Sequence, residues 1–80
     1  MTIDKLDLEI LREIARLPHE ASISEILKPF EKRIGHSSFY ERIWNLARLD
    51  LIKAEKYRHY VFVAITERGQ EAQSKEDRTS

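Results

Sequence analysis

Side chains that could read nucleic-acid bases gather in one short stretch of the sequence. Just after Gly35 come five hydrogen-bonding residues: His36, Ser37, Ser38, Tyr40 and Asn45. The Asn45 amide could bond adenine at two points, an arrangement worth about 1–3 kcal/mol of discrimination between bases. Reaching base edges would require these side chains to lie on the outside of a helix that fits the major groove. The alternative for Asn45 is an ordinary exposed polar residue.

Cationic side chains accompany this stretch. Those after the base-reading candidates are predicted to contact phosphates, which positions a protein without carrying sequence information: Arg48, Lys53, Lys56 and Arg58. Arg58 and its neighbour His59 could also reach the DNA backbone or the minor groove. A second group precedes the stretch: Lys28, Lys32 and Arg33. Each of these charges could instead belong to a solvated surface.

Tyr40 and Trp44 are one helical turn apart on the expected outer side of the same helix. Aromatic residues at that spacing are usually core. The alternatives are stacking at the DNA backbone and an aromatic anchor for a protein partner. Phe62 raises the same question further along the chain.

The charge is unevenly distributed. The formal net charge is zero, which argues against a non-specific nucleic-acid coat protein because phosphate neutralisation dominates such binding. Residues 28–60 nevertheless carry a net charge of +4, against −3 for residues 1–27 and −1 for residues 61–80. The positive charge therefore lies where a DNA-binding surface would have to be.

The sequence carries little that indicates catalysis. Its three histidines are far apart, no pair has metal-ligand spacing, and there is no cysteine, glycine-rich phosphate loop or nucleophile elbow. We expect no enzyme activity, metal or cofactor. No apolar run approaches the roughly 20 residues that span a bilayer, and the N-terminus lacks the features of a signal peptide, so we expect a cytoplasmic protein with no membrane partner.

The first predicted element is a helix, in which apolar residues recur at Ile3, Leu6, Ile10, Ile14 and Leu17. Thr2 or Asp4 could cap it, and Pro18 should end it. Its apolar stripe is broad, which suggests contact on two sides, either with two elements of the same domain or with a second subunit.

A second helix should begin at Ser22, where Ser22 and Glu25 have the spacing of a capping box. Residues 22–24 could also pair briefly with a sheet edge. Pro29 should kink or break this helix, because it lacks the amide that would bond the Glu25 carbonyl. Gly35 suits the C-cap.

A third helix is predicted over residues 38–49. Ser38 and Glu41 form a second apparent capping box, which would make Glu41 a cap partner and not a DNA ligand. The residues expected to face the core follow at three- and four-residue steps: Phe39, Ile43, Leu46 and Leu49.

The pattern of residues 52–65 indicates a two-stranded ribbon, with Val61, Val63 and Ile65 facing inward. Its turn at Arg58 and His59 lacks the Asn-Gly preference of the tightest hairpins, so a connection longer than two residues is expected. Thr66 could cap a last short helix. The fold class is therefore α+β, mainly α: three helices, a β-hairpin and a short C-terminal helix, with one domain over residues 1–72 and a polar, disordered tail over 73–80.

Two segments resemble the winged helix-turn-helix transcriptional regulators of the MarR and PadR type. Residues 65–71, Ile-Thr-Glu-Arg-Gly-Gln-Glu, are similar to the Leu-Thr-Glu-Lys-Gly run that ends the wing in those families. Residues 38–52 are similar to their recognition helix and its Gly-Leu-Ile exit, with Asp50 in place of the usual glycine.

The resemblance implies a homodimeric regulator that binds double-stranded DNA, with helix 38–49 in the major groove and wing 52–65 on the backbone. It identifies no effector ligand. A different reading is a protein–protein interaction module on the same scaffold, because net charge is neutral, aromatic residues lie on expected outer faces, and a fold does not fix a function.

Overall fold

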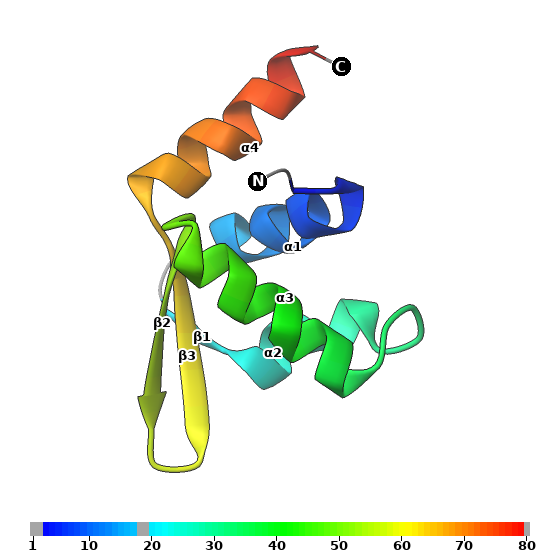
Figure 1. The fold of residues 1–80 in the computed structure, drawn as a ribbon, viewed down its shortest axis with the longest axis vertical. Helices are drawn as coiled ribbons and strands as arrows, with labels where there is room; N and C mark the ends of the chain where they lie inside the picture. Colours follow the sequence, from blue (N-terminus) through cyan, green and yellow to red (C-terminus); the bar gives the residue numbers. More distant parts are fainter. Residues whose placement is uncertain (1–2, 18–19, 80) are drawn as a thin grey trace.

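The computed structural model describes residues 3–17 and 20–79 (Figure 1). In chain order the elements are α1 (Lys5–Arg16), β1 (Ala21–Ser22), α2 (Ile23–Leu27), the 3₁₀ helix η1 (Lys28–Phe30), α3 (His36–Arg48), β2 (Ile52–Tyr57), β3 (Tyr60–Ile65) and α4 (Glu67–Thr79). The described chain is mainly helical, with a three-stranded antiparallel sheet in the order β1-β3-β2. This agrees with the predicted α+β class.

Helix α1 begins where the sequence indicates. Asp4 is its N-cap and accepts a hydrogen bond from the Asp7 amide at 2.9 Å, while the Asp7 carboxylate accepts one from the Asp4 amide at 3.2 Å. This reciprocal pair satisfies two amides at the start of the helix. The other proposed cap, Thr2, and the predicted helix stop, Pro18, lie outside the described residues.

The second helical segment is interrupted at the proline. The Ser22 hydroxyl caps α2 by accepting from the Glu25 amide at 3.4 Å, and Ala21 and Ser22 pair with β3 as a short strand. Helix α2 ends at Leu27, and Pro29 lies in the first turn of η1, where a missing amide is tolerated. The predicted break and the brief edge pairing are both confirmed.

Helix α3 begins two residues earlier than predicted. Its N-cap is Gly35, whose carbonyl accepts from the Phe39 amide at 2.9 Å, and no side chain caps this end. The prediction that Gly35 ends the preceding helix is therefore wrong. The predicted capping box is also wrong, because Ser38 lies inside the first turn and Glu41 has no cap to complete.

Helix α3 ends in a turn that directs the chain into the sheet. The Leu51 amide donates to the Leu46 carbonyl and the Asp50 amide to the Ala47 carbonyl, both at 3.0 Å. This is the Schellman pattern, and Asp50 takes the left-handed conformation that it requires, with φ of 62°. The aspartate thus occupies the backbone position where glycine is usual.

Strands β2 and β3 form a hairpin that projects from the helices (Figure 1). Tyr57 pairs with Tyr60, so the connection has only two residues, Arg58 and His59. The expectation of a longer connection is wrong: Arg58 adopts a φ of 56°, which lets a two-residue turn close without glycine or asparagine. Arg58 and His59 therefore form the tip.

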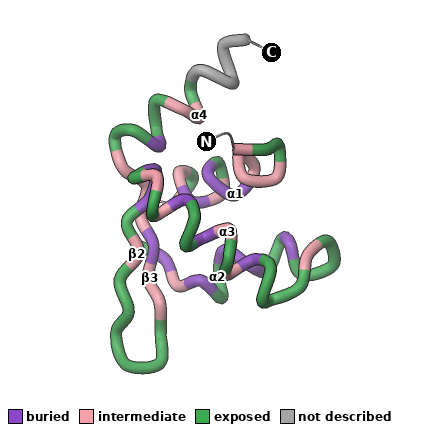
Figure 2. The backbone as a smooth tube through the Cα atoms, in the orientation of Figure 1, coloured by how far each residue is buried: buried purple, intermediate pink, exposed green. Residues whose placement is uncertain are grey.

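The core lies where the hairpin base meets the helices (Figure 2). The buried hydrophobic residues come from every element except α4, together with Leu51 between α3 and β2: Ile10, Leu11, Ile14, Ala21, Ile23, Ile26, Leu27, Phe30, Phe39, Ile43, Leu46, Leu51, Ile52 and Val63. Of the residues predicted to face inward, Leu49, Val61 and Ile65 are only half-buried. The outer half of the hairpin is exposed, so it contributes surface and little to the core.

Helix α4 is joined tightly to the end of α3. The Thr66 hydroxyl donates to the Asp50 carbonyl at 2.6 Å and accepts from the Gly69 amide at 3.1 Å, and the Thr66 amide donates to the Leu51 carbonyl at 3.2 Å. Thr66 therefore caps the helix as predicted. The prediction of a short helix is wrong, because α4 continues to Thr79: beyond Gly69 the sequence has no glycine or proline to stop it.

Candidate nucleic-acid interface

Helix α3 has one buried and one exposed face. Its buried residues are Phe39, Ile43 and Leu46, which lie among the core side chains. The exposed residues recur on the opposite side: Ser37, Ser38, Glu41, Trp44, Asn45 and Arg48. We call these six residues the outer face of α3. Neither α1 nor any other described element buries it.

Of the five candidate base readers, four are exposed: His36, Ser37, Ser38 and Asn45. Tyr40 is half-buried and packs against the core, so it contributes to the fold. Trp44 is 43% exposed, which is too much for a core residue. The two other interpretations of Trp44, stacking at the DNA backbone and anchoring a protein, both remain consistent with its position.

The N-terminal end of α3 is open to an anionic group. Its first turn contains no acidic residue, and no side chain accepts from its first amides. The other long helices differ, because Asp4 and Asp7 occupy the start of α1 and Thr66 and Glu67 the start of α4. Exposed helix amides and the helix dipole favour phosphate, so this end can meet a nucleic-acid backbone.

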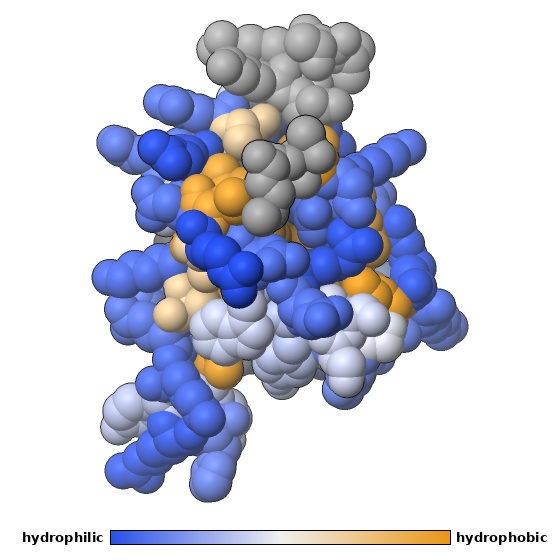
Figure 3. Space-filling model, in the orientation of Figure 1, coloured by the Kyte–Doolittle hydropathy of each residue, from blue (hydrophilic) through white to orange (hydrophobic). Residues whose placement is uncertain are grey.

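The cations of the hairpin are exposed but differ in their contacts. Lys53 forms an ion pair with Glu55 at 3.2 Å, and the Arg58 guanidinium lies over the Tyr57 ring at 5.6 Å. Within residues 3–17 and 20–74, no carboxylate forms an ion pair with Arg48, Lys56 or Arg58. These three cations are therefore available for phosphate contacts, and Lys53 is partly neutralised. In Figure 3 the surface over the hairpin is largely hydrophilic.

The second cationic group is divided in the same way. Arg33 forms an ion pair with Glu9 of α1 at 2.6 Å and lies over the Phe30 ring at 5.7 Å. These contacts occupy its guanidinium within the fold. Lys28 and Lys32 are exposed and have no ion pair with another described residue.

Arg42 positions α3 against α1, a role that was not predicted from the sequence. Its guanidinium donates to both Asp4 carboxylate oxygens at 2.8 Å and to Asp7 at 3.0 Å. The Arg42 side chain is 29% exposed, so these bonds are partly shielded from solvent. The signal in the sequence is weak: Arg42 lies between the apolar positions Phe39 and Leu46, at the edge of the buried face.

The Asp4 carboxylate at this contact has an altered acidity. The Asp7 amide and the Arg42 guanidinium together hold the pKa of Asp4 below its ordinary value of 3.8. The hydrogen bond to Asp4 raises the pKa of Arg42, so the guanidinium remains charged. Because the pKa of Asp4 is lowered in the folded state, its contribution to stability is present above about pH 4 and is lost as the pH falls through the folded value.

Replacing Asp4 with asparagine tests this contact. Asparagine is an equally good N-cap, so the change removes mainly the charge. Because the Asp4 side chain is 57% exposed, solvent weakens the ion pair, and we expect the free energy of unfolding to fall by about 0.5–1 kcal/mol at pH 7. The difference from the unchanged protein should shrink as the pH falls below 3.8 and disappear once the pH is below the lowered pKa of folded Asp4, where Asp4 is protonated in both states. Chemical denaturation across this pH range measures it. A difference that persists undiminished in acid would contradict an electrostatic origin, and Glu71→Gln, which removes an exposed carboxylate on α4, is the control.

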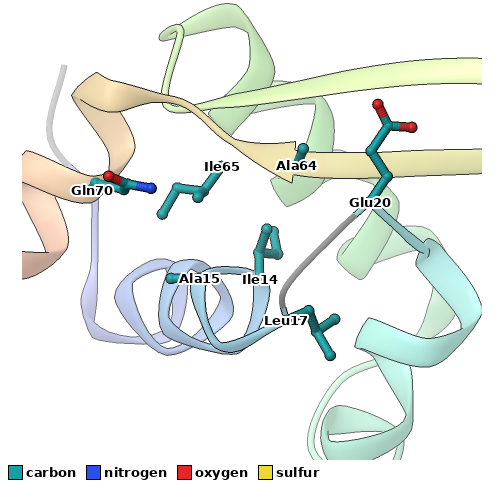
Figure 4. Close-up of a pocket in the computed structure, with 7 residues that line it drawn as sticks. All are labelled: Ile14, Ala15, Leu17, Glu20, Ala64, Ile65 and Gln70. Atoms are coloured by element: carbon teal, nitrogen blue, oxygen red, sulfur yellow. The ribbon is translucent and has the colours of Figure 1, made fainter.

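One pocket lies away from these residues (Figure 4). It has a volume of about 240 Å³ between α1, β3 and the start of α4, and none of the candidate interface residues contributes to it. Its lining is Ile14, Ala15, Leu17, Glu20, Ala64, Ile65 and Gln70.

Comparisons with known proteins leave the site to be interpreted from its geometry. No family model, curated protein or solved structure matches the chain. In the described part of the chain, no helix combines the length and apolar character needed to cross a membrane. The same residues contain no cluster of histidine and carboxylate side chains that could hold a metal ion.

Proposed function

We propose that this protein is a sequence-specific regulator that binds double-stranded DNA as a winged helix-turn-helix. In this proposal α3 enters the major groove, the β2–β3 hairpin is the wing, and the segment from α2 to α3 is the helix-turn-helix. The observation that carries the proposal is that the outer face of α3 is exposed while its opposite face is buried. A helix in that situation can enter a groove without unfolding any part of the core.

The surrounding charges support the same assignment. The α3 N-terminus is open, Arg48 lies near its other end, and Lys56 and Arg58 lie on the hairpin. Contacts from both elements would fix the register of the helix on the duplex, and base-edge contacts would then specify sequence. Arg33 and Lys53 have intramolecular partners, so we assign them smaller roles than the sequence suggests.

The first test is a titration with a random-sequence duplex at about 50 mM salt, where phosphate contacts are strongest. Binding that weakens steeply as salt is added would support the proposal. No binding under these conditions would contradict it and would favour the alternative, a protein–protein interaction module in which Trp44 is the anchor.

Asn45→Ala provides a sharper test of base reading. The amide is proposed to bond adenine at two points, so its loss should relax the preference at one position by about 1–3 kcal/mol. Affinity for random duplex should stay the same, because no phosphate contact is removed. Selection of bound duplexes from a random pool, with wild type and variant in parallel, measures the change. Ser74→Ala, which alters an exposed polar residue on α4, is the control; identical preferences for wild type and Asn45→Ala would remove Asn45 from the interface.

We propose that the regulator is a homodimer. Helix α1 buries Ile10, Leu11 and Ile14, but Leu8 in α1 and Ile3, just before it, are only half-buried. Such residues can add apolar area to a subunit contact, with α4 as the second candidate element. A molecular mass in solution near 9.5 kDa, the mass of one chain, would contradict the dimer.

A further inference from the structure

Glu41 occupies the centre of the outer face of α3. Successive residues of an α-helix are rotated by about 100°, so the six outer residues cover an arc of about 120° with Glu41 at its middle. The buried residues Phe39, Ile43 and Leu46 lie on the opposite side of the helix. Glu41 and, two turns further along the helix, Arg48 therefore point away from the core, and whatever α3 docks against meets both side chains.

The structure gives Glu41 no other role. It is exposed, it does not cap α3, and no described side chain forms a hydrogen bond or ion pair with it. The helix begins at Gly35, so the capping function suggested by Ser38 and Glu41 does not exist. An unpartnered carboxylate on a face with Arg48 and an open helix N-terminus opposes binding to phosphates in general. If this face binds DNA, the repulsion between Glu41 and the phosphates must be offset by a favourable contact that Glu41 itself makes.

We infer that Glu41 is a specificity-determining residue that reads cytosine in the major groove, an inference that rests on the proposed DNA-binding function. A carboxylate only accepts hydrogen bonds, and the cytosine N4 amine is a donor that projects into the major groove. At the centre of the face the carboxylate meets base edges, with the phosphates to either side. A correct base satisfies the charge, whereas an acceptor such as guanine O6 or thymine O4 leaves it desolvated and unpaired.

The position of Asn45 relative to Glu41 predicts the spacing of the two bases that they read. Asn45 follows Glu41 by four residues and lies about 6 Å further along the helix axis on the same face. Base pairs in a duplex are about 3.4 Å apart. The recognised half-site therefore contains a cytosine read by Glu41 and an adenine read by Asn45, about two base pairs from each other.

The experiment compares wild type with Glu41→Gln, which keeps the shape and helix propensity of the side chain and removes its charge. Duplexes are first selected from a random pool with the wild-type protein. Affinities are then measured for the selected duplex, for versions in which each cytosine is exchanged in turn, and for a random duplex. Glu71→Gln on the exposed side of α4 removes the same charge away from α3 and serves as the control.

Two opposite changes are expected for Glu41→Gln. Affinity for the random duplex should rise by about 3- to 10-fold, because one repulsive charge is lost. Discrimination at a single cytosine should fall by about 5- to 150-fold, because the glutamine amide can also donate to guanine O6 or thymine O4, which the carboxylate cannot. Glu71→Gln should change neither.

The failures can be told apart. A uniform rise in affinity with every base preference intact would show that Glu41 only repels the phosphates and reads no base, which would overturn the inference. No change in affinity or in base preference would overturn it as well. Either result leaves the proposed function standing if the wild type binds duplex. A wild type that binds no duplex overturns the proposed function and the inference together.

Discussion

Replacing Gly69 with alanine is expected to lower the free energy of unfolding by about 3 kcal/mol, the range for a forced overlap with backbone. A Cβ at this position would overlap the Leu51 carbonyl oxygen and lie 2.8 Å from Ile65 Cγ1. Intrinsic helix propensity favours alanine over glycine by about 1 kcal/mol. The expected net loss therefore means that the cost of the overlap exceeds this gain in propensity. The backbone has to move, and the bonds from Thr66 to Asp50 and Leu51 are lost with it.

Thermal or chemical denaturation measures this effect. For a domain of this size, each kcal/mol shifts the Tm by about 4–8 °C, so the change should exceed 10 °C. Gly35→Ser is the matched control, because a Cβ at Gly35 meets no atom within 4 Å and serine is a favoured N-cap. Equal or greater stability of Gly69→Ala would show that α4 does not pack against the end of α3 as described.

Removing Arg48, Lys56 and Arg58 together, each by alanine, is expected to produce the largest loss of DNA binding. Each phosphate contact contributes about 0.9 to the slope of log affinity against log salt, so the slope should become shallower by about 3. At about 0.1 M salt this corresponds to a loss of several hundred-fold in affinity. The loss should be the same on all sequences, because phosphate contacts carry no base information.

Fluorescence anisotropy with labelled duplex at several salt concentrations measures both quantities. All three side chains are exposed, so an unchanged unfolding transition should accompany the loss of binding. Arg68→Ala, which removes an exposed cation from α4, should leave the salt dependence unchanged. A triple variant that binds as tightly as the wild type would place the nucleic-acid contact elsewhere or exclude it.

Periodic apolar residues predicted most of the fold. Ile10 and Ile14 in α1, and Phe39, Ile43 and Leu46 in α3, are buried as their spacing indicates. Burial follows from helical periodicity whenever one face must be covered, so this signal is robust. Pro29 was equally informative, because a missing amide limits the backbone regardless of the rest of the fold.

Short local signals were less informative. Ser38 and Glu41 have the spacing of a capping box, yet the helix starts at His36, because a two-residue motif competes with the packing that sets where the chain turns. The two-residue hairpin connection was also missed, since it depends on a positive φ at Arg58 that the residue type does not favour.

The sequence predicted which residues belong to the candidate site, but not which of their side chains are already engaged in contacts within the fold. Exposure of the outer face of α3 followed from the same periodicity that gave the core. Contacts between distant parts of the chain could not be predicted in this way. Arg33 bonds to Glu9 and Arg42 bonds to Asp4, across 24 and 38 positions in the sequence. Such pairs become visible only when the helices are placed side by side.

The outer half of the hairpin offers an adjustable reach. Tyr57 and Tyr60, its last cross-strand pair, are 62% and 58% exposed, and the core ends well before them. Adding two residues to each strand would advance the tip by about 7 Å and keep the alternation of the two sides, whereas adding one would exchange them. Chains of this architecture can therefore reach targets at different distances by changing the length of the hairpin alone, without changing the helices or the core.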